Sequence, residues 1–574
     1  RHSMKKKYVR WTLWTIASPF ILFIILCILI YLPPIQNFLV DKAAVYASEA
    51  TGMNISVGRI SLSFPLNLVV TNVDAASPHN DTLLSVRRLQ VNVQLLPLLK
   101  KQVEVDGISL QGATVNSNDL IHGMKLNGTL GELFISSHGV ALDPETAIVN
   151  KVLLKDTDLS LCLNDTAAAD TAASDTAYWK IILQDIDLQN VSFALDMPLD
   201  SLSLAASLDN AILRDGLIDL HKSAYSLQTF RIENGRVRYD NGKPLAADSL
   251  SSGLDPSHIA LTDIGVKLDS LYYGGRNMKA IISQFVLKER SGVEIVSATG
   301  RMVSNDKVLR VPSLKLETRD SYLELNAAMD WNALDFKDEG LVSARLMADI
   351  GKPDVVRFMG SMDEKFIRQY PSEPLRIRTG IDGDLNKLKL TTLTAELPGA
   401  LGLFARGELT HLTDSLLRGG DITLEAETKD LKFVSTLAEG IEIPYGTRLE
   451  GKFTMAGTKM GTDLLLMQPE AQAVVAADTI PITVYNDSIS VADDFKMERA
   501  ARLFAKYDLS RDRYEADLAV NHFDLHQFMP ADSLYTLSTR LKVEGEGFDF
   551  FSPRTYFNAE GGIDRFHYGS YHLT

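Results

Sequence analysis

Hydrophobic residues follow several patterns along the chain, and the first is an uninterrupted apolar run at residues 11–32 that contains no charge. A helix of this length spans roughly 33 Å, which matches the ~30 Å hydrocarbon core of a bilayer. The alternative is a cleaved signal peptide, whose apolar region has only about 7–15 residues. We therefore predict a retained transmembrane helix, with the anchor residues Trp11, Trp14, Phe20, Phe23, Tyr31 and Leu32.

Basic residues are concentrated immediately before this run, at Lys5, Lys6, Lys7 and Arg10. Positively charged residues next to a membrane span favour the cytoplasmic side. We therefore expect residues 1–10 to form a cytoplasmic tail. All of the chain after Leu32 would then lie on the other side of the membrane.

A helical pattern follows at residues 35–52. Ile35, Leu39, Ala43, Tyr46 and Ala50 recur at helical spacing, and a glycine at position 52 supplies a stop. We interpret this segment as a juxtamembrane amphipathic helix that packs on the first strands. The alternative function for it is to close one end of a larger groove.

From residue 53 onwards the period changes to two, which predicts β-strands with one apolar and one polar face. A short unit recurs along these strands. It begins with two apolar residues that alternate with polar ones, continues with a polar residue or glycine, which we call the polar step, and ends with two more alternating apolar residues. It is clearest at Ile108-Ser-Leu-Gln-Gly-Ala-Thr-Val115 and Ile186-Asp-Leu-Gln-Asn-Val-Ser-Phe193. A bulge or tight turn at the step would shift the alternation in this way, and Gly112 and Asn234 suit such a position. Residues 164–176 contain no large apolar side chain, so we expect a mobile surface loop there.

The second half repeats on a longer scale of roughly 75–90 residues. Segments 354–358, 431–433 and 524–528 each resemble a short helix or turn, and each precedes strands that contain glycine. Repeats that expose an apolar face bury it by stacking. We therefore predict a mainly β fold, an elongated antiparallel sheet with a first region at 53–350 and glycine-punctuated repeats at 351–574. The sequence ends within a strand-like pattern, so we expect the natural chain to be longer.

The composition of the chain argues against several classes of function. The 574 residues carry a formal net charge of −15, which argues against nucleic-acid binding. The two cysteines, Cys27 and Cys162, cannot supply a disulfide framework because one lies in the apolar run. His522 and His526 have the spacing of a zinc-protease helix, but no glutamate follows the first histidine. We expect no enzyme activity, no cofactor and no metal.

Several segments of the first 120 residues resemble the AsmA-like superfamily. They are Pro34-Ile-Gln-Asn-Phe38, the helix ending Ala50-Thr-Gly52, Val57-Gly-Arg-Ile-Ser-Leu62, and Asp81-Thr-Leu-Leu84 followed by Leu89-x-Val-x-Val93. The segment at 81–84 is similar to the TamB family within it, in the form found in Bacteroidetes. The resemblance is looser but continuous from there to the end of the chain.

This resemblance implies a single-pass inner-membrane protein whose β-strands coil into a long groove across the periplasm. Such proteins are implicated in moving phospholipid to the outer membrane and in outer-membrane biogenesis. The TamB family also partners with an outer-membrane barrel protein of the BamA or TamA type. Contact with that partner would use a C-terminal domain that these 574 residues do not contain.

Physical chemistry agrees with lipid carriage, because one 16-carbon acyl chain costs roughly 13 kcal/mol to hold in water. An open apolar groove would remove most of that cost, whereas a closed sandwich would bury the same residues against a second sheet. The other function considered is a scaffold for outer-membrane or secreted proteins, which would bind extended chains at strand edges. A third and weaker hypothesis is that the protein is a cell-surface adhesin. The residues predicted to line the start of the groove are Ile55, Val57, Ile60, Leu62, Phe64, Leu68, Val70, Leu89, Val91, Val93, Leu95, Ile108 and Leu110.

Overall fold

The structure is a computed structural model, and it consists mostly of β-strands. It describes residues 33–63, 66–78, 81–94, 105–117, 123–141, 145–164, 179–243, 253–337, 340–360, 363–438, 440–468, 499–549 and 551–573. The predicted basic tail, the predicted span at 11–32, residues 165–176 of the predicted loop, Phe64 and Leu95 lie outside these ranges. Within them, no helix combines the length and the apolar character that crossing a membrane requires.

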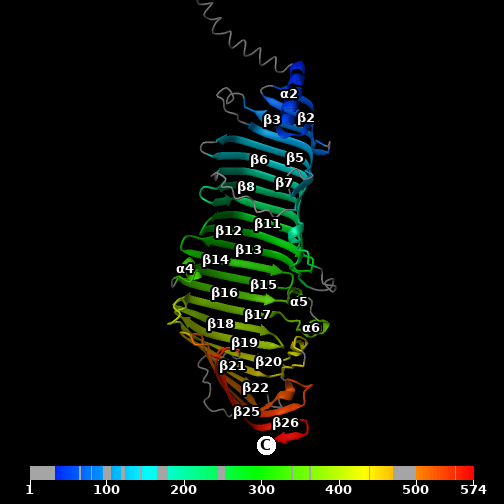
Figure 1. Ribbon diagram of the computed structural model, residues 1–574. Helices are drawn as coiled ribbons and strands as arrows, with labels where there is room; N and C mark the ends of the chain where they lie inside the picture. The colour runs from blue at the N-terminus through cyan, green and yellow to red at the C-terminus, as the bar shows by residue number, and fades with distance from the viewer. Residues whose placement is uncertain are drawn as a thin grey trace, which may run out of the picture. The chain divides into compact units, whose positions relative to one another are not determined.

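The chain divides into two compact units (Figure 1). The first comprises residues 1–245, 256–275 and 282–290, and the second comprises residues 246–255, 276–281 and 291–574. β12 (Asn277–Glu289) contributes residues to both. The other elements of the first unit are α2 (Pro33–Thr51), β1 (Asn54–Ser63), β2 (Asn67–Ala76), β3 (Thr82–Val93), β4 (Val105–Asn116), β5 (Met124–Ala141), β6 (Thr146–Leu163), β7 (Lys180–Met197), η1 (Pro198–Asp200), β8 (Leu202–Asp219), β9 (Ala224–Leu227), β10 (Thr229–Asp240) and β11 (His258–Gly274).

The strands of the first unit pair in chain order from β1 to β8 and then through β10 to β11, with the short β9 beside β8 and β11. These pairs are antiparallel, as predicted, with the exception of β6 and β7. Those two strands are parallel, with Thr146 opposite Lys180 and Cys162 opposite Asp196. A parallel pair needs a crossover connection of about a dozen residues or more, which a hairpin turn cannot supply. The predicted polar loop is the long connection between these two strands.

One left-handed residue interrupts the alternation in successive strands of this unit. The backbone has a positive φ at the polar step of the predicted unit, at Gly112 in β4 and Asn190 in β7. Only glycine, asparagine and aspartate adopt this conformation readily, which explains the residue types at the step. The same conformation occurs within other strands of the unit at Asn72, Asp156, Asn234 and Asp263. The predicted shift of alternation is therefore confirmed, and it keeps apolar residues before and after the step on one face.

The second unit contains the remaining strands and most of the short helices. They are β13 (Glu294–Ser304), β14 (Val308–Thr318), β15 (Tyr322–Asp330), α4 (Trp331–Leu334), β16 (Leu341–Ile350), α5 (Lys352–Met359), α6 (Glu364–Gln369), β17 (Leu375–Asp384), β18 (Lys387–Leu397), β19 (Leu401–Thr410), β20 (Gly419–Thr428), η2 (Lys432–Thr436), β21 (Arg448–Ala456), β22 (Lys459–Met467), β23 (Ala500–Asp508), β24 (Arg513–Asp524), η3 (Leu525–Gln527), β25 (Leu534–Glu546), β26 (Tyr556–Tyr568) and β27 (Tyr571–Leu573). From β13 to β27 each strand pairs antiparallel with the next.

Short helices occupy the three predicted repeat positions. α5 lies between β16 and β17, η2 between β20 and β21, and η3 between β24 and β25. The long-period repeat read from the sequence is therefore confirmed as a helical turn that recurs after every four strands. Residue 351 directly precedes α5, and the change of region predicted there stays a prediction.

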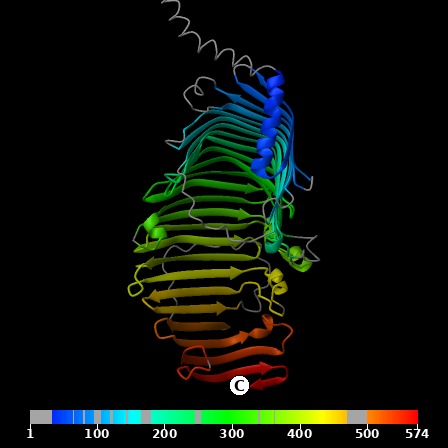
Figure 2. The same cartoon turned by 45° about the horizontal axis from the view of Figure 1, so that its top comes forward.

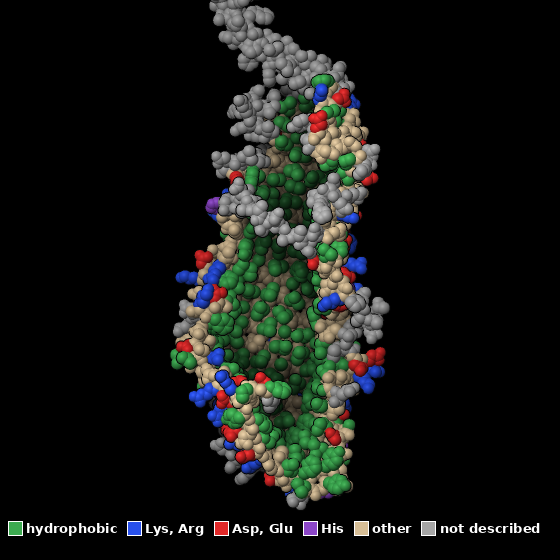
Figure 3. Space-filling model, viewed as in Figure 1, with side chains coloured by type: hydrophobic (Ala, Val, Ile, Leu, Met, Phe, Trp, Pro, Cys, Tyr) green, Lys and Arg blue, Asp and Glu red, His purple; other side chains and the backbone are tan. Residues whose placement is uncertain are grey.

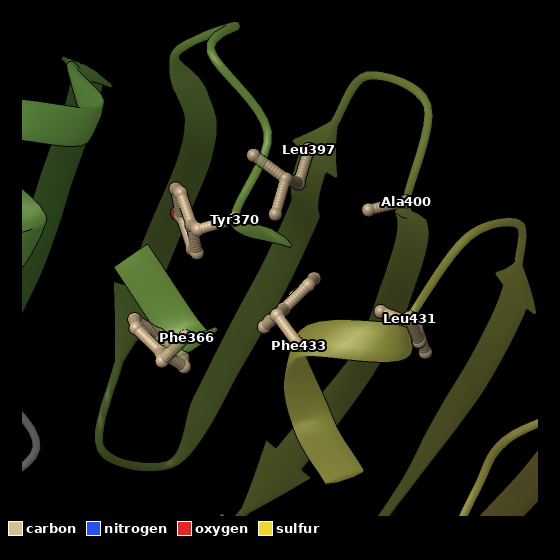
Figure 4. Packing of buried hydrophobic residues seen from close by; sticks show 6 residues of the cluster. All are labelled: Phe366, Tyr370, Leu397, Ala400, Leu431 and Phe433. Atoms are coloured by element: carbon tan, nitrogen blue, oxygen red, sulfur yellow. The ribbon is translucent and has the colours of Figure 1, made fainter. Parts of the chain in front are cut away.

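The two faces of the strands differ in chemistry. Figure 3 shows hydrophobic side chains gathered over a hollowed face, with charged side chains along its margins. A cluster of buried hydrophobic residues lies where α6 and η2 meet the ends of β18 and β19 (Figure 4). There Phe433 contacts Phe366 and Tyr370 edge-on, at ring-centroid distances of 5.6 and 5.1 Å. Burial in this cluster raises the pKa of Tyr370.

Glycine is required at Gly383 in β17. Its φ is +135°, and a Cβ atom there would overlap the carbonyl oxygen of Lys387. We expect Gly383→Ala to lower the free energy of unfolding of the full chain by about 1–3 kcal/mol, measured by urea-induced unfolding. Gly562→Ala in β26 is the matched control, because nothing lies within 4 Å of the added atom. Equal effects of the two substitutions would contradict this account.

Glu450 in β21 predicts a dependence of stability on pH. Burial raises the pKa of its carboxyl above the ordinary value of 4.5, and Glu425 directly opposite adds to the effect, partly opposed by Arg448. The folded state then binds more protons than the unfolded state above pH 4.5, so the free energy of unfolding falls as pH rises through this window. We expect Glu450→Gln to lessen that fall, measured by urea unfolding at several pH values between 4 and 8. The exposed Glu560→Gln should leave the pH profile unchanged; identical profiles for all three proteins would refute the assignment.

Candidate functional site

The predicted groove residues of the first four strands come together as two cross-strand rows. Residues directly opposite each other in neighbouring strands have side chains on the same face. One row consists of Leu62, Leu68, Val91 and Ile108, and the other of Ile60, Val70, Leu89 and Leu110. All eight side chains are half-buried.

The other described members of the predicted set also face apolar partners. Ile55 lies opposite Ala75, Val57 opposite Val73, and Val93 opposite Val105. The structure therefore places every described candidate in a strand and beside an apolar neighbour. Whether these side chains contact lipid stays a prediction.

Both rows continue beyond the residues that the sequence analysis singled out. The alternation that revealed the first four strands is also present in the later ones, and it could have identified these residues too. The first row continues through Ile135, Val152, Ile186, Leu213, Phe230 and Leu268, and the second through Leu133, Leu154, Leu188, Ala211, Ile232 and Val266.

The second unit has a row of the same kind. It runs through consecutive strands from β14 to β24, with one small or branched aliphatic side chain from each. Its members are Leu316, Leu323, Ala348, Ile377, Ala395, Leu403, Ala426, Leu449, Leu466, Ala501 and Val520.

Burial distinguishes these rows from the core of a closed sandwich. Every valine, leucine, isoleucine and phenylalanine in the three rows is half-buried, and only the alanines Ala211 and Ala348 are buried. A layer packed on a sheet normally removes such side chains from solvent almost completely. The large aliphatic side chains in these rows therefore remain within reach of a ligand.

The neighbouring residues on the same strands are polar. In β3, Arg88 donates a hydrogen bond to Gln90 at 3.2 Å, and Gln90 donates to Asn92 at 3.1 Å. In the second unit, ion pairs such as Arg378 with Asp349, at 2.7 Å, join adjacent strands. Alternating residues therefore separate a hydrated face from an apolar one.

Helix α2 lies along the outer edge of β1, where a strand normally exposes unpaired backbone groups (Figure 2). The Gln36 Nε2 donates to the carbonyl oxygen of Leu62 at 3.1 Å. Near the other end of the strand, the backbone N–H of Ile55 donates to the Ser48 Oγ at 3.0 Å. The helix therefore occupies backbone groups that an added strand would need.

The described side chains of α2 show one side of the helix that meets the strand. Gln36 and Val40 are buried and Ala44 and Ser48 are half-buried, so the stripe facing β1 is partly polar. The side chains of the predicted stripe, Ile35, Leu39, Ala43, Tyr46 and Ala50, lie outside the described residues. The predicted apolar stripe therefore stays a prediction.

The helix itself is where the sequence predicted it. It begins two residues earlier, at Pro33, because proline fits the first turn of a helix, whose N–H groups have no partner in the helix. It ends as expected at Gly52, whose φ is +71° and whose N–H donates to the carbonyl of Ser48 at 2.9 Å.

The histidine pair does not share a helix face. His522 belongs to strand β24, has a φ of +45°, and contacts Asn521 and Arg565 through its ring nitrogens. His526 belongs to η3, and its Nδ1 lies 2.9 Å from the carbonyl oxygen of Asp532. Across the described ranges, no three histidine, cysteine or acidic side chains lie together as a metal site would require.

Comparisons of the chain with protein-family models, with curated proteins and with solved structures return no match. The resemblance to the AsmA-like superfamily therefore rests on the residues quoted above, and it stays a hypothesis.

Proposed function

We propose that this chain carries phospholipid between the inner and outer membranes along an open groove formed by its apolar strand faces. The observation that carries the proposal is the half-buried state of the large aliphatic side chains in rows that cross many consecutive strands. Extensive apolar surface that stays accessible marks sites for lipids or other apolar ligands. The resemblance to the AsmA-like superfamily points to the same ligand class.

The energetics suit acyl chains. Each CH₂ group removed from water contributes about 0.8 kcal/mol, so rows of leucine, isoleucine and valine offset most of the cost of extracting a lipid. Similar aliphatic side chains occur in each successive strand of the rows. The free energy of a bound acyl chain should therefore change little as the chain moves from one strand to the next. The charged headgroup would stay at the solvent side, and direction would come from a concentration gradient or from a partner.

The location follows from the same proposal. The apolar run at 11–32 would anchor the chain in the inner membrane with residues 1–10 in the cytoplasm and the strands in the periplasm. Delivery to the outer membrane would involve a barrel protein of the BamA or TamA type. The family to which the resemblance points, TamB within the AsmA-like superfamily, is part of this proposal.

The alternative function, a scaffold that binds extended chains, receives less support at the edge of β1. Strand addition at β1 would compete with the hydrogen bonds from Gln36 and Ser48 of α2. The apolar rows, in contrast, carry no such competing contact at Val91 or Leu89 among the described side-chain hydrogen bonds. The apolar rows therefore support lipid carriage, and the occupied edge of β1 weighs against strand addition there.

Adjacent residues of β3 provide a matched test. A photo-crosslinking amino acid at Val91 should form adducts with phospholipid, because this position belongs to an apolar row. The same amino acid at Gln90 should not, because Gln90 bonds to Arg88 and Asn92 on the polar face. Mass spectrometry of the full-length protein purified from membranes measures both. Equal labelling at the two positions, or no labelling at either, would contradict the proposal.

A charge placed in the row separates the two functions. We expect Val91→Asp to slow phospholipid transfer between the membranes at least about tenfold, because a carboxylate is costly in a path for acyl chains. Gln90→Asp should leave transfer unchanged. Circular dichroism must show the same strand content for both variants. Normal transfer by a folded Val91→Asp protein would argue for the edge-binding scaffold.

A further inference from the structure

A separate cavity of about 340 Å³ lies in the second unit, where β24, β25, β26 and β27 come together. This volume is at the lower end of the range for small-molecule sites, which is about 300–1,000 Å³. Its lining residues are Arg499, His522, Asp524, Thr536, Arg565, Phe566, His567, His572 and Leu573. The apolar rows described above do not include any of them.

The cavity has an excess of cationic side chains in a chain whose net charge is −15. Its one carboxylate, that of Asp524, accepts hydrogen bonds from the His526 backbone N–H at 3.2 Å and the Gln527 Nε2 at 3.0 Å. No described carboxylate forms an ion pair with either Arg499 or Arg565. Within the described part of the chain, neither guanidinium group therefore lies within ion-pair distance of a carboxylate.

Arg499 is held in an unusual state. Its backbone has a φ of +71°, which is uncommon for a residue with a side chain, and its Nη1 is buried. Among the described residues, this nitrogen has no hydrogen-bond partner. A buried donor without an acceptor is destabilising, and more so when it carries charge. An anion in the cavity would remove this destabilisation.

Arg565 is fixed by a neutral histidine. Its Nη1 lies 2.6 Å from the His522 Nε2, and the Nδ1 of the same ring lies 2.7 Å from the Asn521 Oδ1. A guanidinium can only donate, so Nε2 must accept and the ring proton must be on Nδ1. His522 therefore orients Arg565 without adding a competing charge, and the other N–H groups of Arg565 stay available to a ligand.

Apolar residues border the same cavity. Phe566 lies opposite Leu537 in β25, and Leu537 lies opposite Phe523 in β24. Leu573 of β27 lies opposite Phe566 on the other side. Phe566 directly follows Arg565 in β26, so its side chain lies on the opposite face of the strand from that of Arg565.

We propose that this cavity binds a phosphate group, with Arg499 and Arg565 as the donors. Arginine matches phosphate because its N–H groups form paired, charge-assisted hydrogen bonds with the oxygens. The group could belong to a lipid headgroup or to a free phosphate, and both present the same oxygens. The site does not depend on the lipid-transfer proposal, whose crosslinking test concerns a strand of the first unit.

The test uses the full chain in detergent and two probes, inorganic phosphate and monomeric dihexanoyl phosphatidylglycerol, in calorimetry at constant ionic strength. We expect saturable binding that is at least tenfold weaker in both Arg499→Gln and Arg565→Gln. Arg513→Gln, at the exposed start of β24 and outside the cavity, should bind like the natural protein. Tighter binding of the lipid would identify a headgroup site, and equal or tighter binding of phosphate would identify a free-anion site.

Arg499 is half-buried and its Nη1 is buried, so Arg565→Gln, which alters an exposed side chain, decides the matter if Arg499→Gln fails to fold. Absence of saturable binding by both probes would overturn the proposal. Binding that survives Arg565→Gln, or that falls equally in Arg513→Gln, would overturn it as well.

Discussion

Every strand of a sheet with one apolar face has to keep its register, because a slip of one residue moves all of its side chains to the opposite face. In the first unit the requirement is stricter, since several strands also shift their alternation part of the way along. Left-handed residues such as Gly112 and Asn190 make that shift at matching places in successive strands. Asn190 also donates a hydrogen bond to Asp156 of the neighbouring strand at 2.8 Å, which ties adjacent steps together. The continuity of the apolar rows depends on this alignment.

A sheet of this kind leaves its edges and strand ends to be protected by other elements. At β1 the helix α2 supplies side-chain partners for the backbone, and this explains why polar residues of the helix face the strand. In the second unit, α6 and η2 bury Phe366 and Phe433 against each other beside the ends of two strands. Close packing is therefore concentrated at the connections, while the strand faces themselves stay half-buried. The connections between strands contain the closely packed side chains, whereas the strand faces keep the side chains that a ligand could reach.

The two proposed sites use opposite chemistry within this arrangement. The rows of aliphatic side chains offer no specific partner and would suit any acyl chain, whereas the cavity near Arg499 and Arg565 selects for an anionic oxygen group. The second unit contains both the apolar row from Leu316 to Val520 and this cavity. A molecule with both an acyl chain and a phosphate therefore has complementary surfaces within one compact unit.

Local patterns in the sequence determined the elements of this protein. Period-two alternation located the strands, the glycine and asparagine steps located the shifts in alternation, and the repeats at 354, 431 and 524 located the helical turns, because each of these features depends on neighbouring residues. The described groove candidates, such as Val91 and Leu89, followed from the same alternation.

Only the tertiary structure decided which segments meet. The parallel pairing of β6 with β7 depends on how a long connection runs, and the buried face of α2 depends on the hydrogen-bonding needs of the edge of β1. The cavity near Arg499 and Arg565 unites residues from several consecutive strands, and no spacing in the sequence indicates it. Each of these features depends on long-range backbone pairing, which residue periodicity does not encode.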